Sequence, residues 1–423
     1  MADTDKYSVM YRLNLRFVIN QQDVIQISAG DIVSISINNR YDDKTYPMFR
    51  LRLYSDLSVL QSLTDNPDGI ELRGSFDGGI YRMVENTKTP ILVKPTQSIQ
   101  ISMKGYIEYK NTPTSKMDQY ANGLPITIDN TLYANNKVPI EIYCYDEHTV
   151  HHMKDQSQAV YHDMTIPSII NAMLNRCNIQ KKQVDPIQNQ IKFNQVLVPN
   201  LSMLDALSFF DLIYGLYPKG GMVFGGLDKL YICDLASSNG TVPLPIYVHS
   251  YKNNSDMSGM MFAGNDYFMQ TEFASVSILS ESDIERVLQS ERIVSVNVNT
   301  LEQSVVDLPF YNESKKQIDQ NLITEDAIGN ISPQLLLHKT TNPYYASMAA
   351  ARINEKITKV DVSGVGFDIA KITPNTRYNL IFSSPIRGMN MADCYRASYV
   401  THVLVPSGND MFTAETTMTL CRN

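Results

Sequence analysis

Residues 357–423 form a run of short segments in which apolar and polar residues alternate, with turn-forming residues between the segments. Alternation with a period of two places the apolar side chains on one face of a strand. Gly, Pro and Asn mark the turns that separate the segments. This stretch therefore predicts antiparallel strands with one buried face, at 359–363, 378–382, 395–405 and 411–421.

The first 150 residues show the same pattern in shorter pieces. Apolar residues alternate with Arg and Asn at 11–19, and alternation returns at 32–37, 48–54, 91–93, 99–103 and 140–145. Short strands with turn signals between them favour a small barrel over residues 1–150. Two segments interrupt it. Residues 56–63 fit a short helix or a strand edge, and the polar segment 110–137 fits a protruding loop that makes contacts.

In the middle of the chain the apolar period becomes helical. Thr165 suits a helix N-cap and Pro167 the first turn. The apolar residues that follow share one helical face: Ile166, Ile169, Ile170, Met173, Leu174 and Cys177. A second helix is expected from Ser202, with Asp205 completing a weak capping box. Together with an extended segment and a hairpin, at 191–198, 222–224 and 230–233, these helices predict a small α+β domain over residues 160–240.

Residues 245–423 return to a sheet pattern, so we expect a second barrel there. Its first part has strand-like segments at 267–279 and 293–299, with a short helix between them at 281–291. An acidic polar connection follows at 311–332, and a third helix at 344–355. The predicted fold class is therefore mainly β (α+β), with two antiparallel β-barrels flanking the small α+β domain.

Composition excludes several classes of protein. At 423 residues the chain is long for one domain, and its 43% apolar and 19% charged residues exclude a chain that is disordered throughout. The net charge is −8, and the sequence has no Lys/Arg-rich block of the kind that a protein wrapping duplex DNA requires. Such a charge suits a conduit along which DNA slides, as it suits most cytosolic proteins.

The cysteines and the apolar runs indicate where the chain folds. Its five cysteines are widely spaced and form no CxxC motif, which favours reduced thiols and assembly in a cytosol (Cys144, Cys177, Cys233, Cys394 and Cys421). The first 11 residues are polar, and no run of about 18 apolar residues occurs. We therefore expect neither a secretion signal nor a membrane span.

Four of the seven histidines gather near the end of the first predicted barrel. They are His148, His151, His152 and His162, close to Cys144, Asp146, Glu147, Asp155 and Asp163. His148 and His152 have the spacing of two metal ligands on one helical face. Glu147 precedes the first histidine, so the order differs from the HExxH motif of zinc proteases. A solvated linker between domains is the commoner origin of such a segment, and we predict no metal site.

The other candidate sites also have simpler explanations. Gly220, Gly221, Gly225 and Gly226 precede Asp228, where a phosphate-binding loop requires Lys, so a hairpin turn is expected. Glu281, Asp283 and Glu285 could supply the carboxylate pair of a glycosidase, but acid-rich surface helices are far commoner, and the chain has no Trp to stack on a sugar. His402 lies among apolar residues of a strand, which predicts a packed histidine. We predict no catalytic residue, no bound cofactor and no enzymatic activity.

The C-terminal pattern resembles the C-terminal barrel of phage baseplate hub proteins. The resemblance lies in a valine strand ending in Gly, a Pro-Asn turn, an aliphatic strand, a Tyr-x-x-x-x-Val-x-His-x-Leu strand, a Gly turn and a Thr-rich strand. Here these are Val362, Gly364, Pro374, Leu380, Tyr395, Val400, His402, Leu404, Gly408 and residues 413–420. The similarity extends more weakly back to about Thr165, and the N-terminal part matches only in pattern.

This resemblance implies a structural virion protein in the tail baseplate of a contractile-tailed bacteriophage. Such hubs are homotrimers in which each chain supplies two barrels similar to the tail-tube fold, so that three chains form a ring of six barrels. The ring joins the tail tube to the central spike, contacts other baseplate proteins and encloses a channel through which DNA passes as cargo. The implied place of assembly is the host cytoplasm.

Two other functions agree with the same features. One is a hub or lysin-type protein of a non-contractile tail or a secretion-type injection machine. The sequence ends at Asn423, just after the last predicted strand, and we expect a dedicated hub rather than a fusion. The other is a peptidoglycan-degrading enzyme of the tail tip, which would lose activity on substitution of Glu285 or His152.

Overall fold

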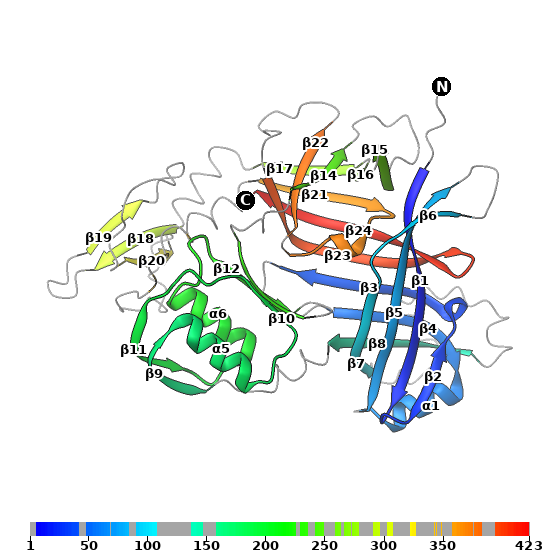
Figure 1. The fold of residues 1–423 in the computed structure, drawn as a ribbon, viewed down its shortest axis with the longest axis horizontal. Helices are drawn as coiled ribbons and strands as arrows, with labels where there is room; N and C mark the ends of the chain where they lie inside the picture. The colour runs from blue at the N-terminus through cyan, green and yellow to red at the C-terminus, as the bar shows by residue number, and fades with distance from the viewer. Residues whose placement is uncertain are drawn as a thin grey trace.

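The computed structural model describes a mainly β protein, in agreement with the predicted fold class. Most described residues belong to one 16-stranded sheet and to a smaller unit beside it (Figure 1). The described residues are 6–41, 48–67, 69–83, 90–107, 137–146, 158–225, 229–235, 242–248, 259–263, 266–271, 273–278, 291–296, 303–307, 322–326, 342, 344, 348, 358–374, 376–382 and 394–422.

The N-terminal strands follow one another through antiparallel pairing and return to the start through the last two strands of the chain. In spatial order this first ring consists of β1 (Lys6–Ile19), β5 (Ile70–Met83), β7 (Ile99–Ile107), β8 (Lys137–Asp146), β4 (Met48–Asp56), β3 (Ile32–Arg40), β23 (Cys394–Gly408) and β24 (Met411–Arg422). The hairpin β23–β24 closes the ring because β23 pairs with β3 and β24 pairs with β1. Helix α1 (Leu57–Asp65) occupies the segment for which the sequence left helix and strand edge open.

A second ring of pairings uses the same hairpin. From β1 it passes to β15 (Gly259–Ala263), β16 (Asp266–Thr271), β14 (Leu244–Val248) and β22 (Arg377–Phe382), and then returns to β23 and β24. Strand β14 runs parallel to both of its neighbours, whereas the other pairings of this ring are antiparallel. Because β1, β23 and β24 belong to both rings, the two halves of the chain form one sheet.

The remaining strands of this sheet extend it outward. Strand β21 (Thr358–Val365) pairs with β24 and with β17 (Phe273–Ile278), β2 (Asp23–Ile27) pairs with β1, and β6 (Ile91–Pro95) pairs with β5. The four C-terminal strands predicted from the sequence are thus confirmed as β21 to β24.

The unit beside the sheet has its own hydrophobic core. It contains β9 (Ala159–Thr165), α5 (Ile166–Arg176), β10 (Lys182–Val184), β11 (Lys192–Val198), α6 (Met203–Ile213), β12 (Gly221–Gly225) and β13 (Leu230–Asp234). Both predicted helices are confirmed, and the apolar stripe of α5 is buried. Ser202 caps α6, since its hydroxyl accepts a hydrogen bond of 3.2 Å from the Asp205 amide. At the start of α5, Thr165 has the N-cap position without such a bond.

A separate three-stranded sheet lies at one end of the molecule in Figure 1. It consists of β18 (Glu291–Val296), β19 (Gln303–Asp307) and β20 (Leu322–Asp326). Strand β20 falls inside the segment 311–332, for which the sequence predicted only a polar connection, and that prediction was wrong at 322–326. The acidic end of β20 pairs with Glu291 and Arg292 of β18, and local polarity does not exclude such an edge strand.

The main core lies inside the sheet. Residues from β1 to β24 contribute to it, so the first and last strands bury their apolar faces together. The Tyr11 hydroxyl accepts a hydrogen bond of 2.9 Å from the Ile369 amide and so ties the two ends of the chain to each other. The domain limits at 150, 160–240 and 245 stay a prediction, as does the loop 110–137, of which only residue 137 is described.

Candidate assembly surfaces

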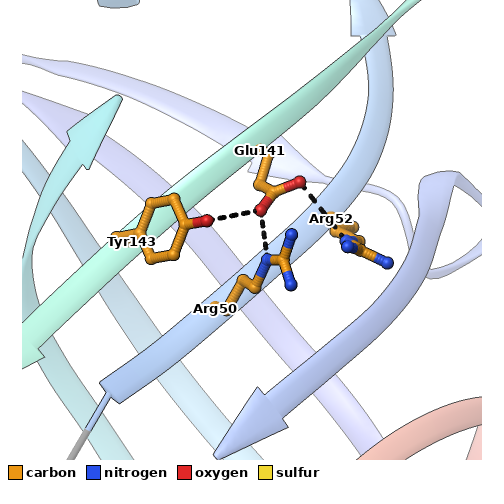
Figure 2. Close-up of polar contacts among 4 residues, drawn as sticks. All are labelled: Arg50, Arg52, Glu141 and Tyr143. Carbon is orange, nitrogen blue, oxygen red and sulfur yellow. Dashed lines mark hydrogen bonds and ion pairs between the residues drawn. The ribbon is translucent and has the colours of Figure 1, made fainter. Parts of the chain in front are cut away.

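A cluster of charged side chains lies on the outer face of the first ring. On β4, Phe49, Leu51 and Leu53 are buried, and Arg50 and Arg52 point away from the core between them. Figure 2 shows both arginines reaching toward Glu141 on the neighbouring strand β8. The sequence indicated the alternation on each strand separately, but not that the polar residues of the two strands meet.

Glu141 is the centre of this charged cluster. It accepts hydrogen bonds from Arg50 Nε and, at 2.8 Å, from the Tyr143 hydroxyl, and its second oxygen lies 3.4 Å from Arg52 Nε. Burial by itself raises the pKa of Glu141, but the bonds from Arg50 and Tyr143 and the charges of both arginines outweigh it and lower the net pKa. The cluster is therefore a preorganised ionic patch.

The aromatic rings at the junction of the sheet with the smaller unit form a continuous contact. Tyr41, at the end of β3, meets Phe224 edge to face with 4.8 Å between the ring centroids, and Phe224 stacks on Tyr231 at 5.2 Å. The Lys229 ammonium lies 5.1 Å from the centre of the Tyr231 ring. Such contacts fix the smaller unit against the ring.

A cavity of about 810 Å³ lies at the same junction. Its lining combines aromatic and aliphatic side chains with polar ones, including Asn39, Lys371 and His402. His402 itself is buried and has Nδ1 2.9 Å from Thr416 Oγ1. Burial lowers its pKa to about 3, so the ring is neutral near pH 7. This confirms the packed, hydrogen-bonded histidine predicted from the sequence.

Strand β6 exposes apolar side chains at an edge of the sheet. Ile91, Leu92 and Val93 are 55%, 52% and 49% exposed, and within the described residues β6 pairs only with β5. Exposed apolar strand edges are uncommon on proteins that act alone. The sequence predicted a strand at 91–93 but gave no signal of its position at an edge.

The histidine-rich segment is only partly described. Cys144 is buried in the main core and His162 is exposed on β9, in a different unit. Asp163 lies next to His162, and Asp146 ends β8. Within the described part of the chain, no three His, Cys, Asp or Glu side chains gather as metal ligands would. The rest of the segment lies outside the described residues: His148, His151, His152, Glu147 and Asp155.

The glycine-rich segment forms the predicted hairpin, since β12 pairs with β13 in antiparallel register from Gly221 to Gly225. Gly226 and Asp228 lie outside the described residues, as do Glu281, Asp283 and Glu285. The absence of catalytic residues therefore stays a prediction. No described helix is both long enough and apolar enough to cross a bilayer.

The comparison with protein families identifies the family to which the chain belongs. Residues 6–388 match the family described as Bacteriophage PBS1 gene 109 protein, and the chain belongs to this family. The comparison with curated proteins gives no match. The resemblance to phage baseplate hub proteins predicted from the sequence is confirmed at the level of a phage tail or baseplate protein by this family.

Among solved structures, a tail protein from Neisseria meningitidis MC58 has the same fold. It superposes with a TM-score of 0.50 and 10% identity, over 99% of this chain and 96% of that one. The 43 kDa tail protein of prophage MuSo2 from Shewanella oneidensis aligns over 97% of both chains, with a TM-score of 0.48 and 11% identity.

Proposed function

We propose that the chain is a non-enzymatic structural protein of a phage tail, a baseplate hub that forms a homotrimeric ring between the tail tube and the central spike. In this proposal the ring encloses a channel that DNA crosses as cargo. Neighbouring baseplate proteins bind its outside, and the trimer is assembled in the host cytoplasm before it becomes part of the virion.

The observation that carries the proposal is the hairpin β23–β24, which belongs to two rings of strands in one chain. Three copies of a chain with two ring-like halves present six similar units around an axis. The symmetry of such a trimer is compatible both with a sixfold tube and with a threefold spike. The family and the fold support the tail as its place, while the hub position and the trimer are the steps that we add.

A rigid connection between the halves is what this function requires. Strand β23 pairs with β3 over six consecutive positions, from Tyr399 opposite Arg40 to Leu404 opposite Ile35. Backbone pairing of this kind holds the two rings at a fixed angle, unlike a linker. Load from a contracting sheath would therefore move each chain as one body.

Light scattering on the purified chain, with negative-stain images of the same peak, tests the proposal. We expect three times the 47.8 kDa chain mass and a ring with a central hole. A monomer at micromolar concentration that stays monomeric with its tube and spike proteins would overturn the proposal. A zymogram on peptidoglycan should show no clearing.

A further inference from the structure

Strand β6 is an open end of the large sheet. In the strand order of the described residues, β6 stands at one end and β17 at the other. All five residues of β6 are exposed, and a register shift between Ile80 and Tyr81 loosens its pairing with β5. Within the described part of the chain no strand pairs with the outer edge of β6, and the backbone groups of such an edge are a template for a further strand.

The sequence of β6 fits a strand that is covered on both faces. Ile91 and Leu92 are paired in register with Arg82 and Tyr81 of β5, so their side chains point to opposite faces of the sheet, and Val93 is the extra residue at the register shift. Continuous apolar runs are typical of strands buried on both sides. Each of the three side chains is nevertheless about half exposed in the single chain. Cover from outside the chain would remove this apolar surface from water.

The molecule already joins its own halves by strand pairing, as β23 does with β3. We propose that the same mode joins separate copies, the free edge of β6 in one copy pairing with the edge of β17 in the next. The inference rests on the proposed trimer. A threefold interface is heterologous and needs two different surfaces on each chain, and the two ends of one sheet provide them.

Charge agrees with this pairing. The sequence of β17, residues 273–278, contains no charged residue, and β6 contains only Lys94. Two β6 strands meeting around a twofold axis would instead bring like residues together, and that arrangement closes as a dimer. A five-residue strand buries only a small part of the area of a stable interface, so other contacts between the copies must contribute to the free energy of association.

The first test introduces a charge at this edge of the full-length chain. Leu92→Asp should weaken association at least tenfold, measured as the trimer-to-monomer midpoint by light scattering across a dilution series. Leu197→Asp is the matched control, because Leu197 is an exposed apolar residue, 58% accessible, on β11 of the smaller unit. Equal midpoints for the two variants would overturn the role of β6.

The second test identifies the opposite edge by cross-linking. In a background with Cys177 and Cys394 replaced by Ser, Leu92→Cys and Ser275→Cys are combined and treated with a short bismaleimide. Covalent dimers and trimers should form only in the double variant. Dimers from Leu92→Cys alone would show twofold β6 pairing and overturn the inference.

The outcomes separate the inference from the function on which it rests. An intact trimer that gives no cross-link, with Leu92→Asp behaving like the control, would reject the edge pairing and leave the proposed hub standing. A chain that never forms a trimer would reject both.

Discussion

His402 and Thr416 face each other across β23 and β24, with Nδ1 of the histidine 2.9 Å from the threonine hydroxyl oxygen. This places a neutral imidazole in the hairpin that both rings share. Protonation of the ring would place a charge in a buried site at the position where the two halves are joined.

The first prediction concerns pH. Burial lowers the pKa of His402 to about 3, below its ordinary value of 6.5, so unfolding takes up a proton between these values. The stability that this residue contributes is complete above pH 6.5 and is lost as pH falls toward 3. From pH 6.5 to 5 the loss is about 2 kcal/mol. Urea unfolding at both pH values should show a smaller loss in His402→Gln than in the wild type.

Thr416→Val serves as the control for the pH prediction. It removes the hydrogen-bond partner but keeps the buried imidazole, so the change of stability between pH 6.5 and 5 should persist. A His402→Gln variant with the same pH dependence as the wild type would contradict the assignment.

The second prediction concerns Gly74 on β5. Its φ is +151°, and an added Cβ would lie 1.8 Å from the Asn14 carbonyl oxygen on β1. Gly74→Ala must push the two strands apart, and we expect a loss of about 3 kcal/mol or more in thermal unfolding. At Gly30 the nearest atom to an added Cβ is 3.9 Å away. Gly30→Ala should change stability by less than about 1 kcal/mol, and a similar loss in both variants would argue against the close approach.

The third prediction concerns the charged cluster in Figure 2. Glu141→Gln leaves Arg50 and Arg52 without their shared carboxylate and should cost about 1–2 kcal/mol in chemical denaturation. Glu71→Gln is the matched control: its side chain is 24% exposed against 21% for Glu141, but its partner Arg73 is 44% exposed. The control should lose less than about 0.5 kcal/mol. The reverse order would show that the cluster contributes no stability.

The fourth prediction concerns the helix caps of the smaller unit. Ser202→Ala removes the bond to the Asp205 amide and should destabilise the unit by about 1 kcal/mol. Thr165 makes no equivalent bond, so Thr165→Ala should cost less than about 0.5 kcal/mol. Hydrogen exchange of the first amides of each helix measures both effects locally.

The local sequence pattern was sufficient to predict those helices and strands whose own apolar residues recur with a clear period. The stripe from Ile166 to Leu174 and the alternation in the last strands correspond to α5 and to β21–β24. Strand β5 was not predicted, because Gly74, Gly78 and Gly79 read as turn residues in sequence. In the structure these glycines allow close approach: Asn14 lies against Gly74, and Tyr11 lies against Gly78.

The assembly surfaces depend on contacts between residues distant in sequence. Arg50 meets Glu141 only because β4 pairs with β8, 91 positions along the chain. The exposure of Leu92 likewise depends on which strand stands beside β6. Periodicity within one segment cannot reveal either, since pairing partners are decided by the whole sheet.

The shared hairpin also affects how the chain is made. Strands β1 to β8 leave the ribosome first, yet their ring closes only through β23 and β24, which end at Arg422. Until β23 and β24 are made, β3 and β1 lack the neighbours that close the ring, and closing so long a loop is slow. A chain without β23 and β24 would therefore leave the first ring open between β3 and β1.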